Sequence, residues 1–301
     1  MFRIVLQCFV VSVLTALAAC SPDSGAGSSA QGRASAREGA KVELTVYAAA
    51  STRDALQAIA ALYARDHAAE IVLNFGSSSD LAKQIVAANK ADVFLSADSK
   101  AMDEVAAAGL VDEGSRRDLL SNQLAIIEPV DERGASASLF AEPFSAEQLT
   151  NEKIERLALA NVETVPAGRY AKSWLVKHGV WDAVAARVLP AVDVRAALGA
   201  VESGAARAGI VYRTDVARSK NARIVFVVPS EDGPKIVYPL AVLAQRPHAP
   251  EARELAAFLG SDAAKEVFES FGFTRLAPRV GVPASDAASD TASTPASPHV
   301  K

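Results

Sequence analysis

Strand-like and helix-like stretches alternate along the chain from residue 42 to residue 271. The first strand-like run, 42–47, alternates apolar and polar side chains, and the stretch from Thr52 to Asp66 carries apolar residues at helical spacing. The same succession repeats toward the C-terminus. Strands that alternate with helices are typical of the α/β class. We therefore predict an α/β fold in which helices flank mainly parallel sheets.

The character of the sequence changes in the middle of the chain and changes back near its end. After the apolar run that ends at Ile127 come a loop-like stretch and a second set of strand-like and helix-like segments, whereas 238–276 resumes the pattern of the first set. We expect the last helical region over 252–271. This order predicts two α/β lobes. One combines 41–122 with 238–276, and the other spans 123–237.

The two ends of the chain differ in composition from the middle. Residues 1–19 have a short basic start and an apolar stretch too short for a typical membrane span, as in a signal peptide. The stretch ends in Leu17-Ala18-Ala19-Cys20, which resembles the bacterial lipoprotein signal box, so we expect a lipid on Cys20. Ordinary cleavage after a small-x-small triplet is the alternative. Residues 20–40 are typical of a flexible tether, and 277–301 of a disordered tail.

Cysteine, charge and histidine content argue against several functional classes. Cys8 and Cys20 both lie in the leader, so the rest of the chain has no disulfide, thiolate nucleophile or sulfur ligand for a metal. The 31 basic and 35 acidic residues give a net charge of −4 without a basic cluster, which argues against nucleic acid as a partner. The four histidines are dispersed and match no metal or hydrolase motif. A hydrolase that uses Ser78 as nucleophile is a less favoured alternative, and a structural lipoprotein of the envelope is another.

Two serine-rich turns each lie where a strand-like run gives way to a helix-like one. They are Ala48–Thr52 and Gly76–Asp80. The first amides of a helix have no partner within the helix, and the helix dipole adds partial positive charge there. Hydroxyls beside such amides form a neutral cluster of donors that suits an ionised anion. Plain helix capping by serine is the alternative for either turn alone.

Three later features share this design. Turns at 165–170 and 192–195 follow strand-like or loop-like stretches and open helices, and Tyr212 ends the apolar run 209–212. In open α/β sheets, ligands bind at the carboxyl ends of strands. The donors of the early and late turns would then face one another across a cleft between the lobes. A core tyrosine and ordinary turn chemistry are the alternatives.

Several stretches in one order resemble the periplasmic molybdate-binding proteins of ABC uptake systems, which are type II periplasmic binding proteins. The resemblance covers nearly all of 42–276, and its most specific parts are VPAGRYAK and the pair DVRAAL and GIVY. It implies two lobes with the ligand cleft between them. The stretches are VYAAASTRDAL, NFGSSSDLAKQI, ADVFLSAD, VPAGRYAK, DVRAALGAVESGAARAGIVY and YPLAVL with FGF.

The same resemblance implies the ligand and the residues that hold it. A tetrahedral molybdate or tungstate oxyanion would be bound by the hydroxyls of Ser51, Ser78 and Tyr212 and by the backbone amides of Ala167 and Val194. It also implies a periplasmic monomer that delivers the oxyanion to a membrane permease, with no cofactor. Cys20 would add a lipid anchor. The resemblance thus predicts a binding protein and no enzyme.

A site made only of donors would select among anions by their protons. Molybdate at neutral pH is a dianion without a proton, whereas hydrogen phosphate carries one that needs an acceptor, and leaving it unpaired costs about 1–3 kcal/mol. We interpret Asp80 and Asp193 as first-turn helix residues rather than as that acceptor. A cationic clamp of Arg53, Arg169 and Arg195 is the alternative mechanism. Sulfate, phosphate or another anion is the alternative ligand.

Overall fold

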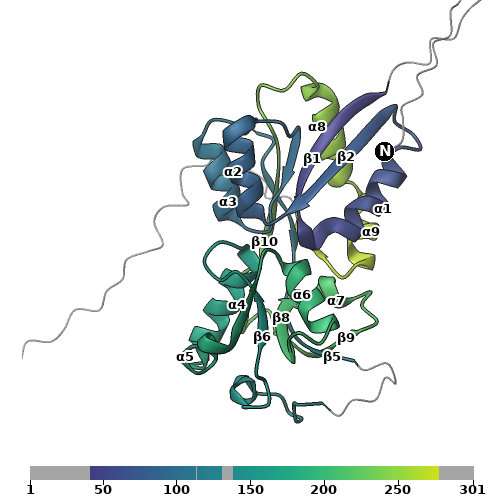
Figure 1. Ribbon diagram of the computed structural model, residues 1–301. Coiled ribbons are helices and arrows are strands. Elements are labelled where there is room, and N and C mark those ends of the chain that lie inside the picture. Colours follow the sequence, from purple (N-terminus) through teal and green to yellow (C-terminus); the bar gives the residue numbers. More distant parts are fainter. Residues whose placement is uncertain (1–40, 113, 131–137, 278–301) are drawn as a thin grey trace, which may run out of the picture. The chain divides into compact units, whose positions relative to one another are not determined.

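The computed structural model describes residues 41–112, 114–130 and 138–277 (Figure 1). Outside these ranges lie the predicted signal peptide, Cys20, the tether and, apart from Ala277, the predicted tail. The statements made above about those segments stay predictions. Among the described helices, none combines the length and the apolar character that a membrane crossing requires.

The first sheet has six strands in the order β11-β4-β10-β3-β1-β2. Its centre is buried because β1 turns Leu44, Val46 and Ala48 into the core at every second position. Figure 1 shows α2 and α3 on one side of this sheet and α1 with α9 on the other. The strands are β1 (Val42–Ala49), β2 (Ala69–Gly76), β3 (Val93–Leu95), β4 (Arg117–Ser121), β10 (Val237–Val242) and β11 (Thr274–Arg275). The helices are η1 (Ala50–Thr52), α1 (Arg53–Tyr63), α2 (Ser78–Ala88), α3 (Ser99–Ala107), α8 (Ala249–Leu259) and α9 (Asp262–Ser270).

The second sheet has five strands in the order β7-β6-β8-β5-β9. Helices α4 and α6 pack on it through apolar faces that include the buried residues Trp174, Leu175, Leu198 and Val201. The strands are β5 (Leu124–Pro129), β6 (Leu157–Ala160), β7 (Val188–Ala191), β8 (Ala208–Tyr212) and β9 (Ala222–Val227). The helices are η2 (Ala146–Thr150), α4 (Pro166–Lys177), α5 (Trp181–Val184), η3 (Ala185–Arg187), α6 (Val194–Glu202) and α7 (Arg213–Val216).

Both sheets are mixed: most strands of each run in one direction, as predicted, whereas β10 and β11 in the first sheet and β5 in the second run against them. Strand β1 runs parallel to β2 and β3, whereas β10 runs antiparallel to β3 and β4. In the second sheet β6 runs parallel to β7 and β8, whereas β5 runs antiparallel to β8 and β9. The antiparallel strands β5 and β10 each enter their sheet directly from the other sheet. No crossover helix precedes them, so nothing returns the chain to a parallel direction.

The chain passes between the sheets twice, between Ser121 and Leu124 and between Val227 and Val237. The predicted lobes have their boundaries at 123 and 237, and we keep this division as a proposal. The last helical region predicted from the sequence, 252–271, contains two helices, α8 and α9. Helix α8 ends at Gly260, and Ser261 caps α9 by accepting a hydrogen bond from an amide of its first turn.

Candidate functional site

A small cavity lies where the ends of strands from both sheets meet helix N-termini. It encloses about 10 Å³, which is at the lower limit for one water molecule. All five residues that the sequence predicted as ligands line it, so the structure brings them together. The lining residues are Ala49, Ala50, Ser51, Gly76, Ser77, Ser78, Ala97, Val165, Pro166, Ala167, Asp193, Val194 and Tyr212.

Two serines on the side of the first sheet contribute hydroxyls to the cavity. Ser51 lies in η1, directly after β1, and its Oγ is 2.9 Å from the hydroxyl of Tyr238. Ser78 is the first residue of α2, and its Oγ accepts a hydrogen bond of 2.8 Å from the amide of Ala97. Both serines are buried. A hydroxyl that accepts a hydrogen bond still has its own proton to donate, so each can serve an anion.

Two helix N-termini on the side of the second sheet contribute backbone amides. Ala167 is the second residue of α4 and Val194 the first residue of α6, and the first amides of a helix have no partner within it. The N-terminus of α4 lies close against the end of β6 because residue 168 is a glycine. A Cβ on Gly168 would lie 2.2 Å from the carbonyl oxygen of Ala160. The glycine therefore permits the approach that places the amide of Ala167 at the cavity.

Tyr212 ends β8 with its hydroxyl in the cavity wall. The side chain is 1% exposed, and within the described ranges its hydroxyl has no hydrogen-bond partner. Burial raises the pKa of the Tyr212 phenol well above its ordinary value, so the group keeps its proton and can donate it. A buried donor without a partner is costly in the ligand-free protein. The position is explained if a bound acceptor satisfies the hydroxyl.

Ser77 and Tyr238 are polar residues at the site that the sequence analysis did not select. Ser77 occupies the N-cap position of α2, is 6% exposed and lines the cavity. Its Oγ makes no capping bond and has no hydrogen-bond partner in the part of the chain that the structure describes. The run of three serines contained this signal, but only its middle member was chosen. Tyr238 lies on β10, remote in sequence from Ser51, so only the fold could reveal its contact with Ser51.

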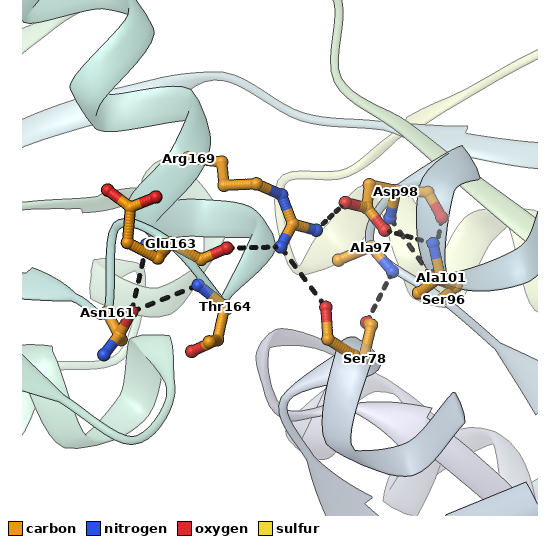
Figure 2. Close-up of polar contacts among 10 residues, drawn as sticks. Ser78, Ser96, Ala97, Asp98, Ala101, Asn161, Glu163, Thr164 and Arg169 are labelled. Carbon is orange, nitrogen blue, oxygen red and sulfur yellow. Dashed lines mark hydrogen bonds and ion pairs between the residues drawn. The ribbon is translucent and has the colours of Figure 1, made fainter. Parts of the chain in front are cut away.

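The arginines beside the predicted donors are engaged elsewhere, and none of them lines the cavity. Arg169 forms an ion pair with Asp98 (Figure 2). Its guanidinium also donates to the hydroxyl of Ser79 at 3.3 Å. Arg195 forms ion pairs with Asp54 and Asp215.

Arg53 lies over the ring of Phe75, with 4.6 Å between the guanidinium carbon and the ring centroid. The neighbouring acids also have partners of their own. Asp80 lies in the first turn of α2 as predicted and pairs with Lys83. Asp193 is the N-cap of α6 rather than a first-turn residue, because its carboxylate accepts a hydrogen bond from the amide of Ala196 at 2.8 Å. The carboxylate that lines the cavity is thus already bound to a donor of its own helix.

The described residues contain no group of three or more His, Cys, Asp or Glu side chains arranged to hold a metal ion. Two of the histidines are bound within their own surroundings. His67 stacks on Tyr63, and His178 contacts the carboxylate of Asp232. The donor set at the cavity fits an oxyanion, which needs hydrogen-bond donors, better than a bare cation, which needs electron-pair donors.

Comparison with known proteins adds independent information. The family described as bacterial extracellular solute-binding protein matches residues 44–274. The molybdate-binding protein ModA of Escherichia coli (strain K12) is 38% identical over 247 residues, which cover 81% of this chain and 92% of that protein. A putative ABC transporter substrate-binding lipoprotein of Bacillus subtilis (strain 168) is 38% identical over 237 residues, covering 78% and 87%. The structure of the periplasmic molybdate-binding protein of Azotobacter vinelandii superimposes with a TM-score of 0.65 at 22% identity, covering 77% of this chain and 98% of that one.

Proposed function

We infer the function from the family, since this chain belongs to the bacterial extracellular solute-binding proteins and within them to the family of the molybdate-binding protein ModA. We propose that it captures a molybdate or tungstate oxyanion for an ABC importer. The family assignment confirms the resemblance seen in the sequence, and the two α/β sheets with flanking helices confirm the expected fold class. Since this family consists of solute-binding proteins, the prediction that the chain is not an enzyme is also confirmed.

The observation that carries the proposal is the set of donors in the lining of the cavity, whose carboxylate, Asp193, already accepts a hydrogen bond from the amide of Ala196. Ser51, Ser78 and Tyr212 offer hydroxyls, and the helix N-termini at Ala167 and Val194 offer amides. Molybdate without a proton accepts hydrogen bonds from all of them, whereas the proton of hydrogen phosphate would meet further donors. An unpaired buried group of this kind costs about 1–3 kcal/mol, or roughly tenfold to a hundredfold in affinity.

We propose that the walls of the cavity move when the ligand enters. The space between them is about 10 Å³, at the lower limit for one water molecule, so the walls on the sides of the two sheets would stand further apart around a bound oxyanion. Two ion pairs join helices on opposite sides, Arg169 with Asp98 and Arg195 with Asp54. We propose that the lobes 41–122 plus 238–276 and 123–237 open by breaking these pairs and close by forming them.

The test is a calorimetric titration of the full chain, purified in detergent, with molybdate, tungstate, sulfate and phosphate. We expect tight binding of molybdate or tungstate and at least tenfold weaker binding of phosphate. Sulfate also lacks a proton, so the site can reject it only by its size. The affinity for sulfate therefore separates selection by size from selection by the proton of the anion. If phosphate bound most tightly, the mechanism of binding by donors alone would be contradicted. If sulfate bound most tightly, sulfate would replace molybdate and tungstate as the proposed ligand.

The membrane attachment rests on the sequence. We propose that Cys20 carries the lipid and holds a periplasmic monomer near the permease. The Bacillus subtilis relative bears the name of a lipoprotein, which supports an anchor. Mass spectrometry of the mature N-terminus tests it, since the expected first residue is a lipidated Cys20 and an unmodified N-terminus at another position would contradict it.

A further inference from the structure

Asn122 lies in the first passage between the two sheets and makes three hydrogen bonds. Its Oδ1 accepts from the backbone amide of Gln123 at 2.9 Å, and its Nδ2 donates to the hydroxyls of Thr214 at 2.8 Å and Tyr238 at 3.2 Å. A backbone amide can only donate, so the atom facing it must be the oxygen. This contact fixes the orientation of the side chain and directs a pure donor at Tyr238.

The hydrogen bond from Asn122 also determines the direction of the hydrogen bond between Tyr238 and Ser51. It accepts from Asn122, and its other partner is the Oγ of Ser51 at 2.9 Å. Burial raises the pKa of the Tyr238 phenol, so the phenol keeps a proton to donate. If Ser51 were the donor instead, the proton of Tyr238 would have no acceptor among the described residues. Because such a buried donor is costly, Tyr238 donates and Ser51 accepts.

We infer that Asn122 and Tyr238 form a relay that holds Ser51 as a hydrogen-bond donor toward the oxyanion, an inference that rests on the proposed function. Ser51 lines the cavity, and since its oxygen accepts from Tyr238, its own proton is free to be donated there. Asn122 and Tyr238 are buried positioning residues that act through Ser51. Asn122 lies in the first passage between the sheets and Tyr238 lies on β10, directly after the second passage, so the relay runs from both places to the cavity.

Replacing Asn122 with Asp reverses the relay without changing its shape. One carboxylate oxygen still accepts from Gln123, but the other now accepts the proton of Tyr238. Tyr238 then accepts from Ser51, whose proton is drawn away from the cavity. We expect the affinity of N122D for molybdate to fall at least tenfold. Tyr238→Phe only removes the link and leaves the Ser51 hydroxyl free to rotate, so we expect a smaller loss of about threefold.

The double variant N122D/Y238F separates the relay from simple charge repulsion. Its carboxylate has the same charge as in N122D but cannot act through Tyr238, so it should bind molybdate more tightly than N122D and close to Y238F. Repulsion alone predicts that the two losses add. Thr214→Val is the matched control, because Thr214 is the other partner of Asn122 and should change the affinity less than twofold.

Titration calorimetry with molybdate on all five proteins, each checked by its thermal unfolding, decides between the outcomes. Recovery of affinity in the double variant supports the relay, and additive losses or an N122D within twofold of wild type overturn it. If N122D does not fold, the comparison of Y238F with T214V decides, since equal effects overturn the relay. A folded wild type that binds none of the four anions overturns the proposed function itself. A wild type that prefers sulfate overturns only the assignment of molybdate or tungstate as the ligand. The same set of variants titrated with sulfate then tests the relay.

Discussion

Arg195 on α6 forms an ion pair with Asp54 on α1, which joins a helix on the second sheet to a helix on the first. Arg195 directly follows the proposed ligand Val194, and Asp54 lies three residues after Ser51. The pair therefore connects the two walls of the cavity. We propose that Arg195 does not bind the anion and instead helps to hold the two walls together around it.

Asp54→Asn should speed the release of molybdate without changing the donors. Both side chains of the pair are partly exposed, so the loss is about 0.5–1 kcal/mol, or roughly twofold to fivefold in the dissociation rate. Stopped-flow dissociation at low and high salt measures it, and the difference from wild type should shrink as salt is added. Asp103→Asn is the control, because its pair with Arg116 lies within the first sheet's part of the chain. Equal effects of the two changes would contradict the role of Arg195.

Tyr212→Phe should weaken the binding of molybdate and leave the ligand-free protein intact. The variant loses a donor to the anion, which costs about 1–3 kcal/mol, or tenfold to a hundredfold. It also removes a buried hydroxyl that has no described partner, so the unfolding temperature without ligand should stay equal or rise. Calorimetry and thermal unfolding measure the two effects. Tyr63→Phe, in the core beneath His67, is the control and should not change affinity.

Ser77→Ala and Ser78→Ala should differ in their effects on stability. Both should weaken molybdate binding by up to about tenfold, since each removes a hydroxyl at the cavity. Only Ser78→Ala should destabilise the ligand-free protein, by about 1–2 kcal/mol, because only the Ser78 hydroxyl accepts a hydrogen bond, which comes from the buried amide of Ala97. Denaturant unfolding and titration on each variant measure the pair. An unchanged affinity in Ser77→Ala would show that the Ser77 hydroxyl does not bind the anion.

Local signals in the sequence predict the turns of the candidate site and the α/β fold class. The turns around Ser51 and Ser78 stand out because strand and helix periodicities meet there at residues with hydroxyls. The reversed direction of β5 and β10 has no such signal, because these strands look like any buried strand and their direction depends on passages between sheets. The contact of Ser51 with Tyr238 spans 187 residues of sequence, so no local pattern could reveal it.

The stability of the protein should fall at acid pH partly through Asp232. Hydrogen bonds from Lys177, Trp174 and His178 lower the pKa of this carboxyl to about 2. Because the pKa is lower in the folded state than in the unfolded state, the carboxylate stabilises the fold above about pH 4, and this contribution disappears as the pH falls toward 2. The group is partly exposed, so the contribution is on the order of 1 kcal/mol.

Unfolding of Asp232→Asn and of wild type by denaturant at pH 7 and at pH 2 measures the contribution of the Asp232 carboxylate to the free energy of unfolding. The variant should be less stable than wild type at pH 7 and should approach it at pH 2. A difference that stays constant over this range would show that Asp232 acts through packing rather than charge. Asp182→Asn, on the neighbouring helix α5, offers a control with a carboxylate of the same type.

Gly168→Ala should damage both folding and binding, in contrast to Gly199→Ala. A Cβ at residue 168 would lie 2.2 Å from the carbonyl oxygen of Ala160 and 2.4 Å from that of Asn161, so the N-terminus of α4 must move away from β6. That movement displaces the amide of Ala167 from the cavity. We expect a loss of about 2–4 kcal/mol in stability and at least tenfold in molybdate affinity. At Gly199 on α6 a Cβ meets no atom within 4 Å, and alanine favours the helix by about 0.5–1 kcal/mol. Thermal unfolding and titration of both variants compare them, and a Gly168→Ala protein that binds like wild type would exclude Ala167 as a ligand held by this contact.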